Sequence, residues 1–234
     1  MHVHHHGQGP TDDEPSDEQL LDLAGRMNAP ENEIPAAVPI STLLARTDDV
    51  AIALIGAQAY SAGLRFDLAV RLRQEPRGTM AQKSFALLHG YPEQGSDDPL
   101  LLGVEYADGR TATNIPGAGW AFGPVGADPD QPSLSPAGGG GGGRSYDQSF
   151  WLTPLPPAGP LLVICAWWAV GIAETRTTLD GAAILAAGSL AVTLWPPLPP
   201  QDREPFEPRM PRVPDGGWFA EVVARGQRGP DPTG

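Results

Sequence analysis

The stretch GLRFDLAVRLR, residues 63–73, alternates apolar and charged residues with a period of two. Its apolar members fall on one side of an extended chain and its charged members on the other; the first set is Leu64, Phe66, Leu68, Val70 and Leu72, and the second is Arg65, Asp67, Arg71 and Arg73. A strand needs this pattern when one face packs in a core and the other meets water. The stretch therefore predicts a half-buried β-strand.

The flanking segments predict further strands and tight turns. Residues 48–60, DDVAIALIGAQAY, are a second strand candidate, which YSAG, residues 60–63, joins to the first. Residues 100–114, LLLGVEYADGRTATN, predict two strands around Asp108-Gly109, because this pair of turn residues tolerates a positive φ. The period of two then places Val104 and Tyr106 on the same face.

Residues 146–179 predict two more strands, separated by the proline-rich connection PLPPAGP. LLVICAWW, residues 161–168, is apolar on both faces, which predicts a central strand covered on both sides. Its adjacent Trp167 and Trp168 must then point to opposite faces. Asp180 is expected to cap a helix over residues 181–191, and residues 192–195 are a candidate closing strand.

Many short strands, tight turns and one short helix predict an all-β chain, an antiparallel β-sandwich that is immunoglobulin-like in general architecture. We expect this domain at residues 39–196, with a flexible Gly-rich loop at 132–146. Residues 1–38 predict an acidic, mostly disordered tail with a marginal helix over 16–27. Residues 197–234 predict a Pro-rich tail whose apolar WFAEVV, residues 218–223, docks on the domain or on a partner.

The charge balance argues against polyanionic partners. The formal net charge is −13, from 15 basic and 28 acidic residues. Nucleic acid and an anionic membrane surface are bound through clustered Lys and Arg, so neither is an expected partner. The first fifteen residues contain no apolar signal region, and the longest apolar run, residues 161–173, is shorter than the about 20 residues of a spanning helix. A cytoplasmic location is therefore expected.

Six glycines, residues 138–143, precede Arg144 and Ser145. Both phosphate-binding glycine motifs require a strand before and a helix after them, and here a proline-containing segment precedes and a strand candidate follows. Ordering glycine is costly, and no side chain returns that cost. The run is expected to be a mobile linker, or a place where another backbone approaches closely.

No catalytic or metal-binding constellation emerges from the residue spacing. Four histidines lie in MHVHHH, which is interpreted as a natural tail or a tag remnant, and His89 stands alone in a loop-like stretch. Cys165 lies in an apolar run and is expected to be a buried thiol. A glycosidase pair drawn from Asp147, Glu105 and Glu174 is conceivable, but solvated sheet faces explain these residues better. Neither a cofactor nor a metal is expected.

Aromatic residues gather in the last third of the domain, at Trp151, Trp167, Trp168 and Trp195. Core packing explains most of them, while a second tryptophan of the adjacent pair could cover a sheet or form a platform for a sugar or a partner. The candidate binding residues are Arg144, Tyr146, Trp151 and Trp168. PPLPP, residues 196–200, is interpreted as a stiff spacer in preference to a ligand of a proline-binding groove.

The order of these blocks resembles a group of uncharacterised bacterial proteins from high-GC genomes. The resemblance rests on residues 48–73, on GVEYADGR, on a glycine tract followed by Arg and an aromatic residue, on FWLTPLPPAGPLLVICAWWAVGIAETRTTLDGAAI and on a closing Trp. It covers roughly residues 41–196 and implies a single natural domain. It implies no activity and no functional residue.

The leading functional hypothesis is a non-enzymatic, cytoplasmic β-sandwich that binds a protein partner. One alternative is a carbohydrate-binding or glycan-processing domain, which a concave patch joining Trp151 and Trp168 to two carboxylates would favour. A second alternative is a self-assembling structural protein, which a long uncovered sheet edge would favour.

Overall fold

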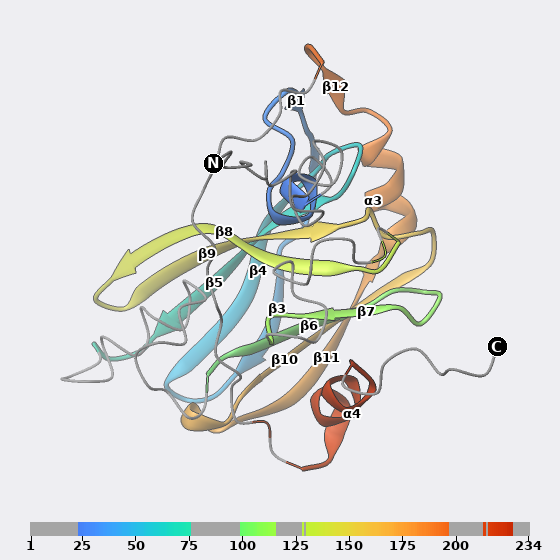
Figure 1. Cartoon of the computed structure of the whole chain (residues 1–234). Helices are drawn as coiled ribbons and strands as arrows, with labels where there is room; N and C mark the ends of the chain where they lie inside the picture. Colours follow the sequence, from blue (N-terminus) through green and yellow to red (C-terminus); the bar gives the residue numbers. More distant parts are fainter. Residues whose placement is uncertain are drawn as a thin grey trace, which may run out of the picture.

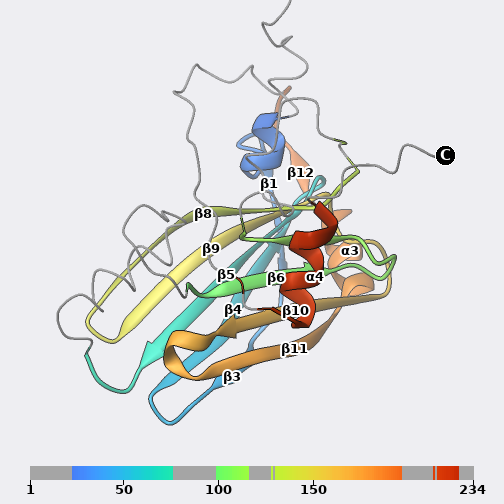
Figure 2. The same cartoon turned by 60° about the horizontal axis from the view of Figure 1, so that its bottom comes forward.

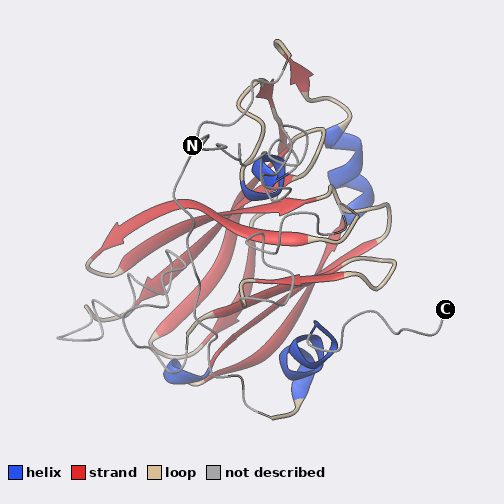
Figure 3. Cartoon of the chain, viewed as in Figure 1, coloured by secondary structure: helices blue, strands red, loops and turns tan. Residues whose placement is uncertain are grey.

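The computed structural model describes residues 23–75, 99–115, 128, 130–196, 213 and 215–226. The fold is an antiparallel β-sandwich, as the sequence predicted (Figures 1 and 3). The larger sheet has the strand order β2-β4-β5-β9-β8, and β3 also pairs with β4. Its strands are β2 (Ala36–Val38), β3 (Thr42–Arg46), β4 (Val50–Ala59), β5 (Leu64–Leu72), β8 (Ser133–Gly142) and β9 (Ser145–Thr153). The other has the order β11-β10-β6-β7, with β6 (Leu101–Glu105), β7 (Thr111–Thr113), β10 (Pro160–Trp167) and β11 (Ile172–Asp180).

The remaining elements lie outside these two sheets. A short 3-10 helix, η2 (Trp168–Val170), follows β10, and α3 (Gly181–Gly188) follows β11. A separate two-stranded sheet pairs β1 (Glu33–Ile34) with β12 (Val192–Thr193). The helix α4 (Gly217–Gly226) follows every strand of the described residues in the sequence.

The alternating stretch that predicts the fold is β5, which is paired on both sides within the larger sheet. It hydrogen-bonds to β4 and β9, and Phe66 lies opposite Phe150 with their rings stacked 5.7 Å apart. Leu64 and Leu68 are fully buried, whereas Arg71 on the other side is exposed. The period of two in the sequence therefore reflects one face turned into the core.

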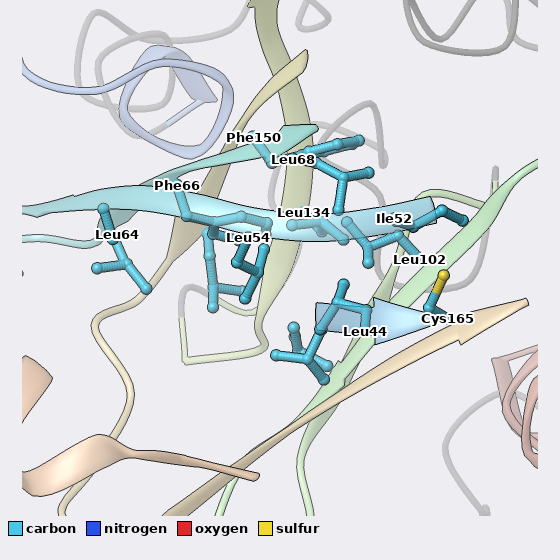
Figure 4. Close-up of a cluster of buried hydrophobic side chains, with 14 of the residues drawn as sticks. Leu44, Ile52, Leu54, Leu64, Phe66, Leu68, Leu102, Leu134, Phe150 and Cys165 are labelled. Carbon is cyan, nitrogen blue, oxygen red and sulfur yellow. The ribbon is translucent and has the colours of Figure 1, made fainter. Parts of the chain in front are cut away.

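The core fills the space between the two sheets (Figure 4). Val104 and Tyr106 both lie in it, as the register argument predicted. Strand β10 is central and covered on both sides, because Cys165 faces the core while Ile164 packs on the outer side against α4. The sheets also meet along their margins, where β11 lies against β3 and β7 lies against β8.

The glycine run differs from the expected loop over residues 132–146. Gly139 to Gly142 pair with β9 as the end of β8, and only Gly143 and Arg144 form the turn. Gly143 has a φ of +59°, which suits the first position of a two-residue hairpin turn. A Cβ atom on Gly141 would lie 2.4 Å from the carbonyl oxygen of Ser145, so the glycines let two backbones approach closely.

The larger sheet begins a few residues before residue 39, the expected start of the domain. Strand β2 belongs to the larger sheet, pairing Val38 with Ala57, and the carbonyl of Arg26 accepts hydrogen bonds from the hydroxyls of Ser133 and Ser135 in β8. Residues 23–27 are helical, and the carbonyl of Gly25 accepts a hydrogen bond of 2.8 Å from the indole of Trp151. The rest of the expected acidic tail, residues 1–22, lies outside the described residues.

Helix α3 begins as the sequence predicted and ends earlier. The Asp180 carboxylate accepts hydrogen bonds from the backbone N–H groups of Ala182 and Ala183, which have no partner in the helix itself. The helix ends at Gly188, whereas the sequence predicted residues 181–191. The expected closing strand over residues 192–195 is confined to Val192–Thr193 and pairs with β1 outside the sandwich. Among the described residues, no helix is long and apolar enough to cross a membrane.

Candidate functional site

Strands β1 and β12 extend beyond one end of the sandwich (Figure 1). Large apolar side chains of these strands and of the residues beside β12 are exposed. We call this group the apical patch. Its exposed fractions lie between 44% for Leu194 and 70% for Leu190, and its members are Ile34, Leu190, Val192, Leu194 and Trp195. Exposed apolar side chains that lie together on a protein surface often mark a binding site.

The backbone beneath the apical patch is held in place. Ile34 and Val192 lie directly opposite each other in the β1–β12 pair and therefore share a face. Asn32 extends the pair, because its carbonyl accepts the N–H of Leu194 at 2.8 Å and its side-chain amide donates to the carbonyl of Trp195 at 2.6 Å. The patch is thus displayed on a paired backbone.

A polar contact fastens β1 to the β4–β5 connection of the larger sheet. The Glu33 carboxylate accepts hydrogen bonds from the N–H and the hydroxyl of Ser61. Glu33 points to the side opposite Ile34, since neighbouring residues in a strand alternate. One side of β1 is therefore anchored by hydrogen bonds while the other contributes to the apical patch.

The second candidate surface is the outer face of the four-stranded sheet, which α4 covers (Figure 2). Trp218, Phe219 and Val222 are buried there. They pack with outward-facing apolar residues of the sheet and its neighbouring loops, namely Leu101, Ile115, Ile164 and Ala166. This contact accounts for the apolar WFAEVV segment: it docks on the chain's own sheet.

Gly103 forms a hollow in this face, and the indole ring of Trp218 occupies it. Two carboxylates fix the orientation of the tryptophan. The indole N–H donates to Glu105 over 2.8 Å, and the backbone N–H donates to Glu174 over 3.0 Å. The backbone N–H belongs to the first turn of α4, where an acidic partner is favourable because those N–H groups lack helical acceptors.

A shallow groove of about 790 Å³ runs beside α4. Charged groups of both signs line it, from the sheet through Glu105 and Arg176 and from the helix through Glu221 and Arg225. Arg176 is already paired with Glu174 at 3.2 Å. Among the described residues, no three metal-ligating side chains lie together in this groove or elsewhere.

The four binding residues suggested by the sequence do not share a surface. Arg144 is exposed in the β8–β9 turn, while Tyr146 faces the core between the sheets. Trp151 is fully buried and touches Tyr60 edge to face at 5.4 Å. Trp168 is the first residue of η2, after β10, where it is half-buried and lies edge to face with Phe219.

The carboxylates suggested as a glycosidase pair also have structural partners. Asp147 forms an ion pair of 2.7 Å with Arg71 on the larger sheet. Glu105 and Glu174 are on the smaller sheet, and both accept hydrogen bonds from Trp218. The concave patch of tryptophans and carboxylates that would favour glycan binding is therefore not formed by these residues.

Cys165 lies in the core, as expected for a structural thiol. Burial raises the pKa of its thiol to about 12, so the thiolate needed for nucleophilic attack is disfavoured. His89 and the amino-terminal histidines lie outside the described residues.

Sequence reasoning missed both candidate surfaces as sites. For the apical patch, the signal was the recurrence of leucine and valine at every second residue over Leu190, Val192 and Leu194. This pattern predicts a strand with one face in the core, because the sequence does not show that the strand pairs with β1 outside the two main sheets. For the α4 site, Gly103 in an apolar strand was the signal, since such a glycine marks close approach of another group.

These surfaces must be interpreted from their own chemistry. A comparison of the chain with protein-family models, with curated proteins and with solved structures gave no match.

Proposed function

We propose that the protein is a non-enzymatic β-sandwich that binds a partner protein through the apical patch of Ile34, Leu190, Val192, Leu194 and Trp195. The observation that carries this proposal is the exposure of these side chains, with Trp195 at 56% and Leu190 at 70%, on a hydrogen-bonded backbone. Exposed apolar area is costly in water, and a partner that covers it recovers that free energy.

The composition of the patch fits a protein partner. Tryptophan is enriched at the centres of protein interfaces, where its large rigid side chain buries much area with little loss of conformational freedom. Asn32 supplies polar atoms at the rim, as is common around an apolar interface core. The complementary surface on the partner is therefore apolar at its centre.

A pull-down followed by reconstitution with the purified partner tests the proposal. The wild-type chain is compared with a patch variant, Val192→Ser with Leu194→Ser and Trp195→Ser, and with a control, Leu43→Ser with Ile55→Ser. The control residues are also exposed apolar side chains, at 53% and 47%, but they lie on β3 and β4 of the larger sheet. We expect the wild type and the control to bind the partner stoichiometrically and the patch variant to lose it.

Two results would contradict the proposal. The first is equal binding by the patch variant and the wild type. The second is a wild-type dimer in sedimentation that the patch variant abolishes, because this would assign the patch to a second copy of the chain, as the self-assembly alternative requires. Circular dichroism of all three proteins verifies that the sandwich is folded.

A further inference from the structure

The helix α4 and the site that it occupies are separate parts of the chain. The hollow at Gly103 and the acceptors Glu105 and Glu174 all belong to strands of the smaller sheet. The matching groups on α4 lie within one short stretch, residues 218–222. Residues 197–216 join this stretch to the rest of the chain, so the binding contacts themselves do not require that helix and sheet come from the same molecule.

The smaller sheet is complete without the helix. Strand β10 is paired on both sides, with β6 and β11, and β6 is also paired with β7. The inner core is closed by the larger sheet. Undocking α4 would therefore break no strand pairing, and it would uncover the outward-facing Leu101, Ile164 and Ala166.

A helix of this size depends on its docking site. The helix spans ten residues, and isolated helices of this length are marginal in water. Docking and folding of α4 are thus one local event, and segments of this kind open at a lower free energy than the whole domain. The open site then exposes apolar surface together with Glu105 and Glu174, the two carboxylates that accept hydrogen bonds from Trp218 when α4 is docked.

We propose that the outer face of the four-stranded sheet is a receptor for a short helix with a Trp-Phe pair in its first turn, and that two copies of the chain exchange α4 between their sites. Exchange preserves every contact, because each molecule gives one helix and receives an identical one. Swapping of an identical element is for this reason a low-cost route to a symmetric dimer.

The tether sets the balance between the closed monomer and the exchanged dimer. Residues 197–216 would span about 60 Å in an extended proline-rich form, whereas an eight-residue strand such as β10 is about 26 Å long. A covalent tether that can span the distance between two sites holds the second group at an effective concentration in the millimolar range. The monomer therefore dominates in dilute solution, and the dimer forms at high local concentration or when the tether is too short to close within one molecule.

The direct test measures whether α4, supplied as a separate peptide, binds to the outer face of the four-stranded sheet. The probe is a fluorescein-labelled peptide of residues 213–226, and the acceptor is the full chain with Trp218→Ala, whose own helix lacks the indole. We expect saturable binding by fluorescence anisotropy, and we expect Glu105→Ala in the acceptor to weaken it about tenfold or more, since a hydrogen bond to a charged acceptor is lost. Gly103→Leu in the acceptor should abolish binding because it fills the hollow.

Matched controls keep the test decisive if a variant folds poorly. Gly140→Leu in the acceptor places a side chain in open space on β8 and should leave binding unchanged. A probe peptide with Trp218→Ala should not bind, and this result needs no change to the acceptor. Absence of binding by the native probe, or equal binding by the two peptides, would overturn the proposal.

A second measurement addresses exchange between copies. Deletion of residues 199–212 leaves a tether of about 19 Å when extended, which is shorter than an eight-residue strand such as β10, at about 26 Å. We expect this variant to sediment as a dimer, and the same deletion combined with Trp218→Ala to sediment as a monomer. A monomer in the first case would overturn the exchange.

Discussion

Gly103 and Trp218 fit together as a hollow and its occupant. A Cβ atom on Gly103 would lie 2.4 Å from Cζ3 of the Trp218 indole, a separation at which one of the two must move. Residues more than a hundred positions apart in the sequence are thus matched in shape. The first prediction follows from this relationship.

Gly103→Ala is expected to undock α4 or to displace it. Overpacking of a close contact typically costs about 1–3 kcal/mol. The indole of Trp218 should become more accessible, with a red-shifted emission and increased quenching by acrylamide. Subtracting the spectrum of Trp218→Phe, which lacks this indole and its hydrogen bond to Glu105, isolates the contribution of Trp218 from that of the other tryptophans. An unchanged emission spectrum for Gly103→Ala would contradict the close fit.

The glycines of β8 are expected to differ in their tolerance of alanine. Gly141→Ala should lower the free energy of unfolding by about 1–3 kcal/mol, because its Cβ would lie 2.4 Å from the backbone of Ser145. Gly142→Ala should be neutral or slightly stabilising, because a Cβ there meets nothing within 4 Å and alanine restricts the unfolded chain. Urea unfolding of the two variants measures the difference. Equal effects would mean that this end of β8 is not held against β9.

The thiol of Cys165 is expected to make stability depend on pH in the alkaline range. Burial raises its pKa from 9.0 to about 12, so above pH 9 the unfolded chain releases a proton that the folded chain retains. The contribution of this thiol to the free energy of unfolding is fully present below pH 9. Above pH 9 it falls by about 1.4 kcal/mol per pH unit, up to about pH 12. Other groups also titrate in this pH range. The measured quantity is therefore the difference in the free energy of unfolding between the wild type and Cys165→Ala at each pH. A constant difference from pH 8 to pH 11 would contradict this assignment.

Asp180→Ala is expected to destabilise the chain by about 1 kcal/mol, because the N–H groups of Ala182 and Ala183 lose their acceptor. Asp180→Asn should cost much less, since its amide oxygen still caps the helix. Thermal unfolding followed by circular dichroism distinguishes the two. A loss as large for asparagine as for alanine would show that the charge matters more than the cap.

The sequence predicted the sandwich because β5 and the segments around it carry local patterns. Alternation in residues 63–73, the turn pair Asp108-Gly109 and the cap at Asp180 are each decided within a few residues. The unusual strand β8 could not be predicted in this way, since glycine has a low intrinsic preference for strands and only the fit against β9 explains it.

The candidate surfaces depend on contacts between distant parts of the chain. Whether Val192 would be buried depended on the identity of its partner strand, and pairing with Ile34 of β1 leaves it exposed. The local sequence makes Trp151 a reasonable binding candidate, but its side chain is fully buried and its indole donates to the carbonyl of Gly25. Neither the exposure of Val192 nor the burial of Trp151 can be predicted from the residues next to it in the sequence.

The position of α4 after every strand also bears on synthesis of the chain. A ribosome completes both sheets before it adds residues 217–226, so a nascent sandwich that folds early has an uncovered outer face at Gly103 and Ile164. During this interval the face is open to chaperones and to neighbouring nascent chains on the same messenger. Docking of Trp218 therefore follows formation of the sheet, and until it occurs the outer face is open to misassembly.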